Sequence, residues 1–439
     1  MSEKNLVSGL VDFLRACPSM FHTAAAIRAR LDAAGFTYLP EGAAWQMVPG
    51  GRYYTVRNNS SVVALKVGAT LDSYHFQLAA AHGDSPTYKV KAVPELEGPG
   101  ESLRLDVEAY GGMIDHTWLD RPLGVAGRVL VRDGARVESR LVHVADDVCL
   151  IPSVAVHLER GSGLEPKLNR ARDLCPLFSA GALSRGAFDE MVAEAAGCAP
   201  ADVLARDLFL VAHEEPRVWG RAQEFVSGGR LDDLQCAYVA LEAFLATDNP
   251  HDVSVYACFD NEEVGSGTKQ GALSTLLADT LRRANAALGR TEEDYHRALA
   301  GSMLVSCDNA HAVHPSHPEK MDEANRCYLN RGLVIKEAAN QHYCTDAFSR
   351  AVLVALLDRA GVPYQGFANR SDVAGGSTLG NLSNAQVSVH AVDVGLPQLA
   401  MHSVFETAGA RDVELGVAAL RAFYEADVRI DGADGAELA

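Results

Sequence analysis

The sequence has 439 residues, of which 48% are hydrophobic and 22% are charged, and its formal net charge is −18. This charge argues against binding to nucleic acid or to an anionic membrane surface, and no apolar run approaches the ~20 residues of a membrane span. The nine cysteines show neither CxxC spacing nor the density of a secreted disulfide scaffold, so we expect reduced thiols and a cytoplasmic protein.

The N-terminal part of the chain has the pattern of an α/β domain. Residues 21–36 predict a helix that ends at Gly35, and residues 61–68 predict a strand. Residues 75–82 predict a second strand that is almost wholly apolar and therefore central in a sheet.

The middle of the chain is richer in strands. A hairpin is predicted over residues 127–144, with its turn at Asp133-Gly134, and a more helical run follows from Phe178 to Leu208. We interpret residues 94–227 as a β-rich domain inserted into the α/β domain.

Strands and helices alternate again after residue 227. The pattern predicts the elements 230–246 (helix after Gly228-Gly229), 253–259 (strand), 302–307 (strand), 345–361 (helix) and 387–395 (strand). This alternation indicates an α/β fold with a mostly parallel sheet flanked by helices. The catalytic domain would then comprise residues 1–93 and 228–439, with a disordered acidic tail over 431–439.

Acidic residues and histidines follow several of the predicted strands. They are His82 and Asp84, then Asp260, Glu262 and Glu263, then Asp308, and finally His402, while Asp232 begins the helix after Gly228-Gly229. In open α/β sheets, ligands bind beyond the carboxyl ends of the strands. Taken singly, Asp232 could cap its helix and each histidine could be a hydrogen-bonding core residue.

A pair of divalent cations explains why so many carboxylates would gather at one end of a sheet. With one carboxylate bridging, each cation receives a histidine, a terminal carboxylate, the shared carboxylate and a shared water, which suits zinc. Adjacent side chains on extended backbone point in opposite directions, so Glu262 and Glu263 should not both face one metal. One of them would ligate, and the other would accept a proton from the metal-bound water.

Motifs of other hydrolases and of nucleotide-binding proteins are missing from the sequence. It contains no HExxH, no GxSxG, no Walker A and no GxGxxG motif. The glycine-rich run "GSGTKQG" is better explained as a tight turn than as a phosphate-binding loop.

Over essentially its whole length the chain resembles the aspartyl aminopeptidases, a branch of the two-zinc exopeptidases. The matching segments are "AAHGDSP", "TWLDRPLGVAGRV", "IPSVAVHLER", "GGRLDDL", "DNEEVGSG", "DNAHAVHPSHPEKMD", "LVIK" and "PQLAMHS". The resemblance implies hydrolysis of the first peptide bond of peptides that begin with Asp or Glu.

The resemblance also implies a role for each candidate residue of the metal centre. One zinc would be held by His82, Asp232 and Asp308, and the other by Asp232, Glu263 and His402, with Asp232 bridging. Glu262 matches the general base and acid, and Asp84 matches the residue that orients His82. Cobalt or manganese could replace zinc at such ligands.

Further implications concern specificity and assembly. Lys336 matches the position that pairs with an acidic substrate side chain, and His311 and His314 would either line the same pocket or serve as core or supporting residues. The inserted domain resembles the family's dimerisation domain, with His157 reaching a neighbouring active site to stabilise the oxyanion. Such dimers build tetrahedral twelve-subunit shells.

The sequence leaves three alternatives open. The chain could be a broad or neutral aminopeptidase of the same family, or a related carboxypeptidase or deacylase. It could also be a non-catalytic assembly or cargo-binding shell, although a complete ligand set argues against that.

Overall fold

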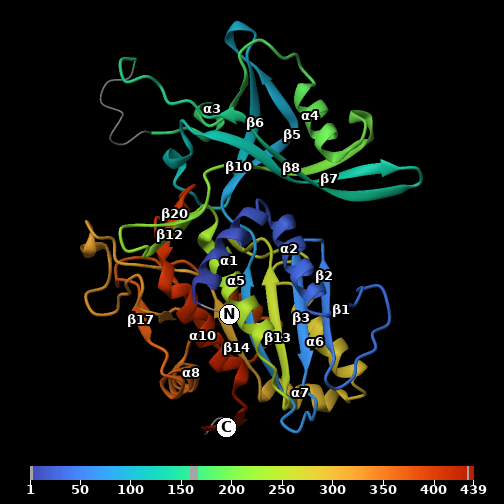
Figure 1. Cartoon of the computed structure of the whole chain (residues 1–439), viewed down its shortest axis with the longest axis vertical. Helices are drawn as coiled ribbons and strands as arrows, with labels where there is room; N and C mark the ends of the chain where they lie inside the picture. Colours follow the sequence, from blue (N-terminus) through green and yellow to red (C-terminus); the bar gives the residue numbers. More distant parts are fainter. Residues whose placement is uncertain (1–2, 159–166, 433–434) are drawn as a thin grey trace.

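The computed structural model describes residues 3–158, 167–432 and 435–439, which form two parts (Figure 1). The lower part in Figure 1 is a sheet covered by helices and contains both ends of the chain, whereas the upper part is a β-barrel formed by the middle of the chain. Every helix of the described residues is too short or too polar to span a bilayer.

The large sheet has the strand order β1-β2-β3-β13-β4-β14-β18-β16-β17. Its strands are β1 (Thr37–Tyr38), β2 (Arg52–Arg57), β3 (Ser61–Val67), β4 (Phe76–His82), β13 (Val253–Phe259), β14 (Met303–Cys307), β16 (Leu333–Glu337), β17 (Tyr364–Ala368) and β18 (His390–Gly395). The central strands β13, β4, β14 and β18 are mutually parallel, and antiparallel pairs flank them on both sides. The predicted α/β fold class is confirmed, with the parallel strands at the centre of a mixed sheet.

Helices cover both faces of this sheet, which is why every residue of β4 and β13 is buried. Ala79 and Ala81 of β4 pack into one core cluster, and Leu78 and Ala80 pack into another, because alternate side chains of a strand point to opposite faces. The first cluster is closed by α1 (Glu3–Ala16), α2 (Met20–Ala33), α5 (Leu231–Ala246), α8 (Ala347–Ala360) and α10 (Ala410–Glu425). The second is closed by α6 (Leu276–Ala287) and α7 (Glu292–Ala300).

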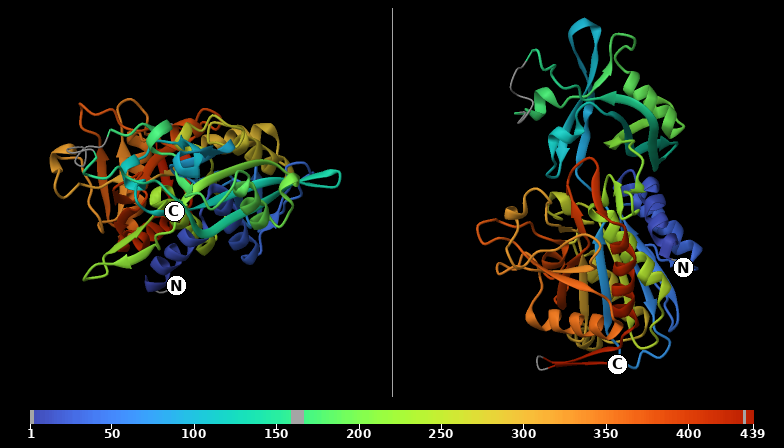
Figure 2. Two further views of the ribbon diagram at one scale, coloured as in Figure 1. Left: turned by 90° about the horizontal axis from the view of Figure 1, so that it is seen from above. Right: turned by 60° about the vertical axis from the view of Figure 1, so that its left-hand side comes forward.

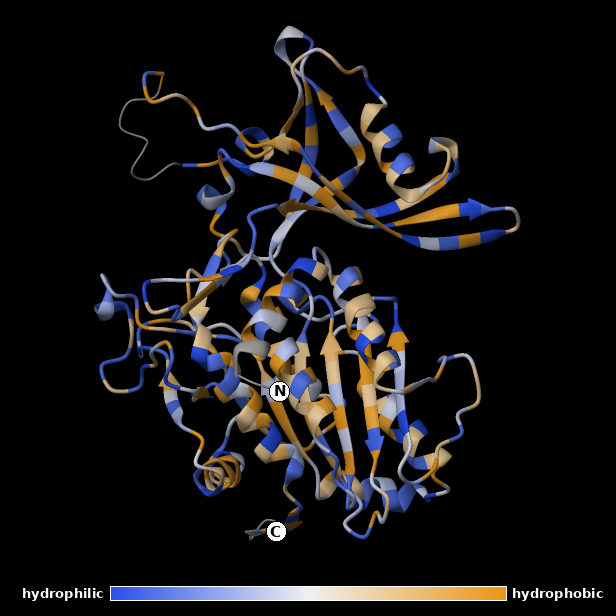
Figure 3. Ribbon diagram, in the orientation of Figure 1, coloured by the Kyte–Doolittle hydropathy of each residue, from blue (hydrophilic) through white to orange (hydrophobic). Residues whose placement is uncertain are grey.

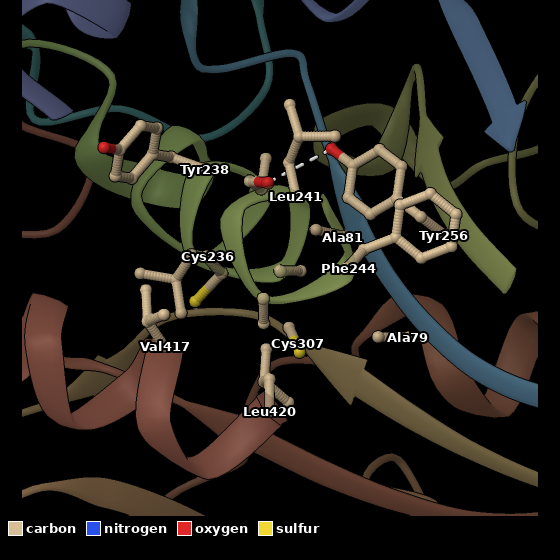
Figure 4. Packing of buried hydrophobic residues seen from close by; sticks show 14 of the residues in the cluster. Ala79, Ala81, Cys236, Tyr238, Leu241, Phe244, Tyr256, Cys307, Val417 and Leu420 are labelled. Atoms are coloured by element: carbon tan, nitrogen blue, oxygen red, sulfur yellow. Dashed lines mark hydrogen bonds between the residues drawn. The ribbon is translucent and has the colours of Figure 1, made fainter. Parts of the chain in front are cut away.

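Helix α5 lies in the middle of the first cluster (Figure 4), and its first turn contains Asp232. Phe244 packs on Tyr256 with ring centroids 6.0 Å apart, and the Tyr256 hydroxyl donates to the Ala237 carbonyl at 3.1 Å. Burying an aromatic side chain of this kind stabilises the fold by about 2 kcal/mol. Colouring by hydropathy shows the same distribution, with apolar residues concentrated on the central strands (Figure 3).

The barrel closes in the order β10-β5-β6-β9-β8-β7 and has its own apolar core. Its strands are β5 (Thr87–Glu97), β6 (Leu103–Tyr110), β7 (Pro122–Asp133), β8 (Arg136–Leu150), β9 (Leu177–Ser179) and β10 (Val203–Ala212). The chain enters the barrel after β4 and returns through β12 (Phe225–Gly228) to α5 (Figure 2). The predicted boundary at residue 94 lies within β5, and that at residue 227 lies within β12.

The predicted hairpin of the barrel is confirmed, because Asp133 pairs with Arg136 across a turn where Gly134 has a φ of 59°. The prediction of a helical run from Phe178 to Leu208 is largely wrong. Only α4 (Ala187–Ala196) is helical there, and the residues around it form β9, a short 3-10 turn and β10. The alanines of this run favour a helix locally, but pairing in the barrel overrides that preference at both ends.

The C-terminal tail also differs from the prediction. We expected residues 431–439 to be disordered, yet β22 (Gly435–Leu438) pairs with β21 (Val428–Asp431). The acidic composition misled the prediction because backbone pairing does not require apolar side chains.

A second, smaller sheet lies beside the barrel junction and has the order β11-β12-β20-β19-β15. Its remaining strands are β11 (Arg217–Trp219), β15 (Ala310–His311), β19 (Pro397–Leu399) and β20 (Glu406–Gly409). The connection from β19 to β20 carries His402, so this sheet fixes one edge of the site described next.

Candidate active site

Eight of the predicted site residues line one cavity of about 130 Å³ at the carboxyl ends of the central strands, namely Lys336, His311 and the six predicted ligands and base. These six are His82 at the end of β4, Asp232 in the first turn of α5, Glu262 and Glu263 after β13, Asp308 after β14, and His402 between β19 and β20. The structure therefore brings together side chains that are far apart in the sequence.

Asp232 lies between the two histidines. Its Oδ1 is 3.6 Å from His82 Nε2, and its Oδ2 is 3.2 Å from His402 Nε2. Asp232 and His82 are buried, whereas the His402 side chain is about one-third exposed. A carboxylate with each oxygen facing a different imidazole has the geometry of a bridging ligand.

Glu262 and Glu263 both face the cavity, which corrects one step of the sequence reasoning. We expected an extended backbone that would point them in opposite directions, but residues Glu262–Val264 form a 3-10 turn. Successive residues of such a turn differ by about a third of a rotation. Glu262 Oε2 is therefore directed toward His82 Nε2, at 3.9 Å, and Glu263 Oε2 toward His402 Nε2, at 3.5 Å.

The ligand atoms form one compact cluster. Those of His82, Asp232 and Glu263 all lie within 4.8 Å of one another, and so do those of His82, Glu262 and Asp308. These groupings overlap at His82 and include Glu262, so spacing alone does not divide the carboxylates between two ions.

Without metal ions, the buried carboxylates of the cluster repel one another. Burial raises the pKa of Glu262 to about 8, and it also raises the pKa values of Glu263 and Asp308, with further increases from neighbouring carboxylates. Burial by itself would lower the pKa of His82, but the nearby carboxylate of Asp232 and the charge of Asp233 raise it well above its usual value. Cations at the cluster would remove this repulsion.

The cluster fits divalent metal ions. Asp232 Oδ1 and Glu263 Oε1 are buried and lack a hydrogen-bond partner in the described structure, although buried carboxylate oxygens normally have one. Imidazole nitrogens and carboxylate oxygens are zinc ligands, and cobalt and manganese accept the same set.

Asp84, which the sequence predicted to orient His82, contacts three residues of the cluster. Its Oδ1 is 3.4 Å from His82 Nδ1 and accepts a hydrogen bond from the Glu262 amide at 3.1 Å. Its Oδ2 accepts from the Glu263 amide at 3.2 Å.

Two supporting residues were missed by the sequence reasoning. Buried Glu406 accepts hydrogen bonds from the amides of Asp232, at 3.1 Å, and His402, at 2.8 Å. Buried Asp233 accepts from the His82 amide at 3.1 Å. Asp233 could have been suspected from the sequence because it follows Asp232 directly. Nothing in the local sequence pattern distinguished Glu406 from an acidic residue on the exposed side of a strand.

Lys336 lines the cavity but is already hydrogen-bonded. Its ammonium donates to the carbonyl of Asp308 at 2.7 Å, to Asp308 Oδ1 at 3.3 Å and to the carbonyl of Asn309 at 3.4 Å. The side chain is 2% exposed and lies 5.1 Å from the centre of the Tyr343 ring. Lys336 thus contacts a predicted metal ligand directly.

The remaining candidates lie in different surroundings. His311 lines the cavity near Phe367, whereas His314 is exposed and stacks with His317. His157 is exposed in the segment after β8 and is not among the described residues that line the cavity. Asp260 is buried outside the cavity lining, where it accepts hydrogen bonds from Asn261 and Gln270.

Comparison with known proteins gives a family match over nearly the whole chain. Residues 13–424 match the model of the family described as "Aminopeptidase I zinc metalloprotease (M18)". A protein of Clostridium novyi named "Probable M18 family aminopeptidase 2" is 40% identical over 425 residues, which are 94% of this chain and 97% of that protein.

Solved structures share the fold. The chain is similar to a cryo-EM structure of the Ape4 and Nbr1 complex, with a TM-score of 0.93 and 32% identity over 96% of this chain and 86% of that one. It is also similar to the structure of an S. cerevisiae mApe1 dodecamer, with a TM-score of 0.84 and 27% identity over 96% of both chains.

Proposed function

The chain belongs to the M18 family of zinc aminopeptidases, and we propose that it removes N-terminal Asp or Glu residues from peptides at a centre that holds two zinc ions. His82, Asp232 and Asp308 would hold one ion, and Asp232, Glu263 and His402 would hold the other. The observation that carries this proposal is the position of Asp232 between the two imidazoles. The buried carboxylate oxygens without partners support it.

Glu262 is the proposed general base. When bound, the zinc ions would polarise the scissile carbonyl and lower the pKa of water toward ~7. Glu262 faces the same cavity and takes the proton from the attacking water, then passes it to the leaving amine. Asp84 holds the Glu262 amide, so the carboxylate stays directed into the cavity.

The acidic preference would come from Lys336, with His311 beside it. One ion pair at ~4 Å gives roughly 4 kcal/mol of gross attraction at an effective dielectric of ~20, before the cost of desolvation. The hydrogen bonds from Lys336 to Asp308 Oδ1 and Asn309 are long, so a substrate carboxylate could replace one of them.

We further propose that the barrel is a dimerisation domain and that dimers assemble into a dodecamer. The likeness to the mApe1 dodecamer supports this, as do the exposed apolar side chains Val154, Val156 and Leu158 around His157. In such an assembly His157 would reach the active site of a neighbouring copy. Nine free cysteines support a cytoplasmic location.

Two measurements test the proposed function. Elemental analysis gives the zinc content per chain, and a panel of free-amine peptides beginning with Asp, Glu, Leu or Lys gives the specificity. Bound zinc with at least tenfold higher kcat/KM for Asp and Glu is the expected result. Equal rates for all four peptides would identify a broad-specificity aminopeptidase instead.

A further inference from the structure

The segment Tyr110–Ile114, which leaves barrel strand β6, touches the metal cluster on two sides. The Tyr110 hydroxyl donates to Asp84 Oδ2 at 2.8 Å and accepts from Asn261 Nδ2 at 2.8 Å. The Ile114 amide donates to the His402 carbonyl at 3.0 Å. The barrel therefore contacts the site within its own chain.

Asp84 connects Tyr110 to the rest of the cluster. Its carboxylate is fully buried and faces the His82 ring and the amides of both Glu262 and Glu263. A carboxylate held by a phenol as well as by two amides has little freedom to rotate. Movement of Asp84 would shift one predicted metal ligand and the proposed base together.

The backbone next to Tyr110 is also fitted closely to the cluster. Gly111 has a φ of +82°, and a Cβ at this position would lie 3.1 Å from Glu263 Cβ. Glycine thus satisfies both the left-handed backbone and the close approach to Glu263. A side chain at position 111 would therefore press on the turn that carries the two glutamates.

We propose that Tyr110 is a positioning residue of the metal centre, supplied by the barrel, which acts through Asp84 on His82, Glu262 and Glu263. This inference rests on the proposed function of the site. Burial and the charges of Asp84 and Asp260 raise the pKa of Tyr110, so the phenol stays protonated and keeps donating at neutral pH.

Another tyrosine of the barrel provides a matched control. The Tyr88 hydroxyl donates to Asp115 Oδ1 at 2.6 Å, and Tyr88 packs in the barrel core against Trp118. Its hydrogen bond also joins a phenol to a carboxylate, but Tyr88 is outside the cavity lining. Loss of either hydroxyl removes a hydrogen bond to a carboxylate, and loss of the Tyr110 hydroxyl also removes the hydrogen bond from Asn261, but only the bonds of Tyr110 lead to the site.

The test compares full-length Tyr110→Phe and Tyr88→Phe proteins with the unchanged protein. Zinc dissociation is measured by chelator competition, the visible absorption spectrum is recorded after cobalt substitution, and kcat and KM are measured on an Asp-initiated peptide. For Tyr110→Phe we expect roughly 10- to 100-fold weaker zinc binding or lower kcat, with KM little changed and an altered cobalt spectrum. Tyr88→Phe should keep all three within about twofold of the unchanged protein, the range of ordinary scatter for a substitution away from the site.

Equal behaviour of the two variants in zinc binding, cobalt spectrum and kcat would overturn the inference. If Tyr110→Phe does not fold, Asn261→Gly is the second test of the inference. Glycine accepts the φ of 64° at that position, and the substitution removes the hydrogen bond that Asn261 donates to the Tyr110 hydroxyl. An unchanged cobalt spectrum in Asn261→Gly would then overturn the inference. If the unchanged protein itself lacks zinc and activity, the proposed function fails. That result can be distinguished from the outcomes above, which concern only differences between the variants and the unchanged protein.

Discussion

The carboxylate of Asp232 joins His82 to His402, with one oxygen 3.6 Å from the first imidazole and the other 3.2 Å from the second. No other side chain of the described residues has an ion-pair contact with both histidines. Loss of this carboxylate should therefore affect both metal positions at once.

Asp232→Asn should lose most of its zinc and at least roughly 100-fold of its activity, since a neutral amide cannot offset two cations. Elemental analysis after gel filtration measures the metal, and a peptide assay measures the rate. Asp252→Asn is the matched control, because Asp252 is also buried but immediately precedes β13, at the opposite end of the strand from the cluster. Full zinc content in Asp232→Asn would contradict the bridging role.

Glu262→Gln should keep both zinc ions but lose roughly 10²- to 10⁴-fold in kcat, because glutamine cannot accept the proton of the attacking water. Glu263→Gln is the comparison, and it should lose zinc along with activity. Comparing the two variants shows which glutamate acts as the base and which as a metal ligand, a distinction that the distances in the compact cluster do not make. A near-normal rate in Glu262→Gln, or zinc loss equal to that of Glu263→Gln, would remove Glu262 from the proposed role.

Lys336→Met should reduce the preference for Asp over Leu by roughly 10- to 100-fold, the effect of a charge-assisted hydrogen bond worth about 1.5–3 kcal/mol. The ratio of kcat/KM for Asp- and Leu-initiated peptides measures this. Lys66→Met is the control, since Lys66 is also buried and donates to backbone carbonyls, but away from the cavity. An equal loss for both peptides would show that Lys336 acts on Asp308 and not on the substrate side chain.

Removing zinc should destabilise the protein more at pH 8 than at pH 5. In the metal-free protein the folded pKa of Glu262 is about 8, above the ordinary value of 4.5. Between these values the folded state binds more protons than the unfolded state, so its stability falls as pH rises. The raised pKa values of Glu263 and His82 act in the same direction.

Zinc ligands remain deprotonated in the loaded protein, so the increase in Tm caused by zinc should grow by several degrees from pH 5 to pH 8. Differential scanning fluorimetry with and without a chelator measures this increase. Asp232→Asn should show little increase at either pH. An increase in Tm that is the same at both pH values would contradict the prediction.

Much of the central sheet could be predicted because buried strands such as β4 and β13 are short, apolar and followed at once by polar residues. The strand-end rule then located His82 and Asp308 without any structure. The local backbone after β13 could not be predicted, since an Asn261 with positive φ turns the chain into a 3-10 helix that the letters "DNEE" do not reveal.

Contacts between segments that are distant in the sequence also could not be predicted. Glu406 and Tyr110 matter only because folding brings them beside Asp232 and Asp84 from distant segments, and no periodic pattern encodes that proximity. The helical preference around α4 was real but was overridden by barrel pairing at its ends.

The two chain crossings that connect the barrel to the sheet lie side by side, because the Ser85 hydroxyl donates to the Asp232 carbonyl at 2.7 Å. The barrel is also held at points away from these crossings, since Arg128 of β7 donates to the Asn58 carbonyl at 2.8 Å and the Ile114 amide donates to the His402 carbonyl at 3.0 Å. A partner bound to the barrel would therefore act on a part of the chain that is joined to the surroundings of Asp232 and His402 by several hydrogen bonds.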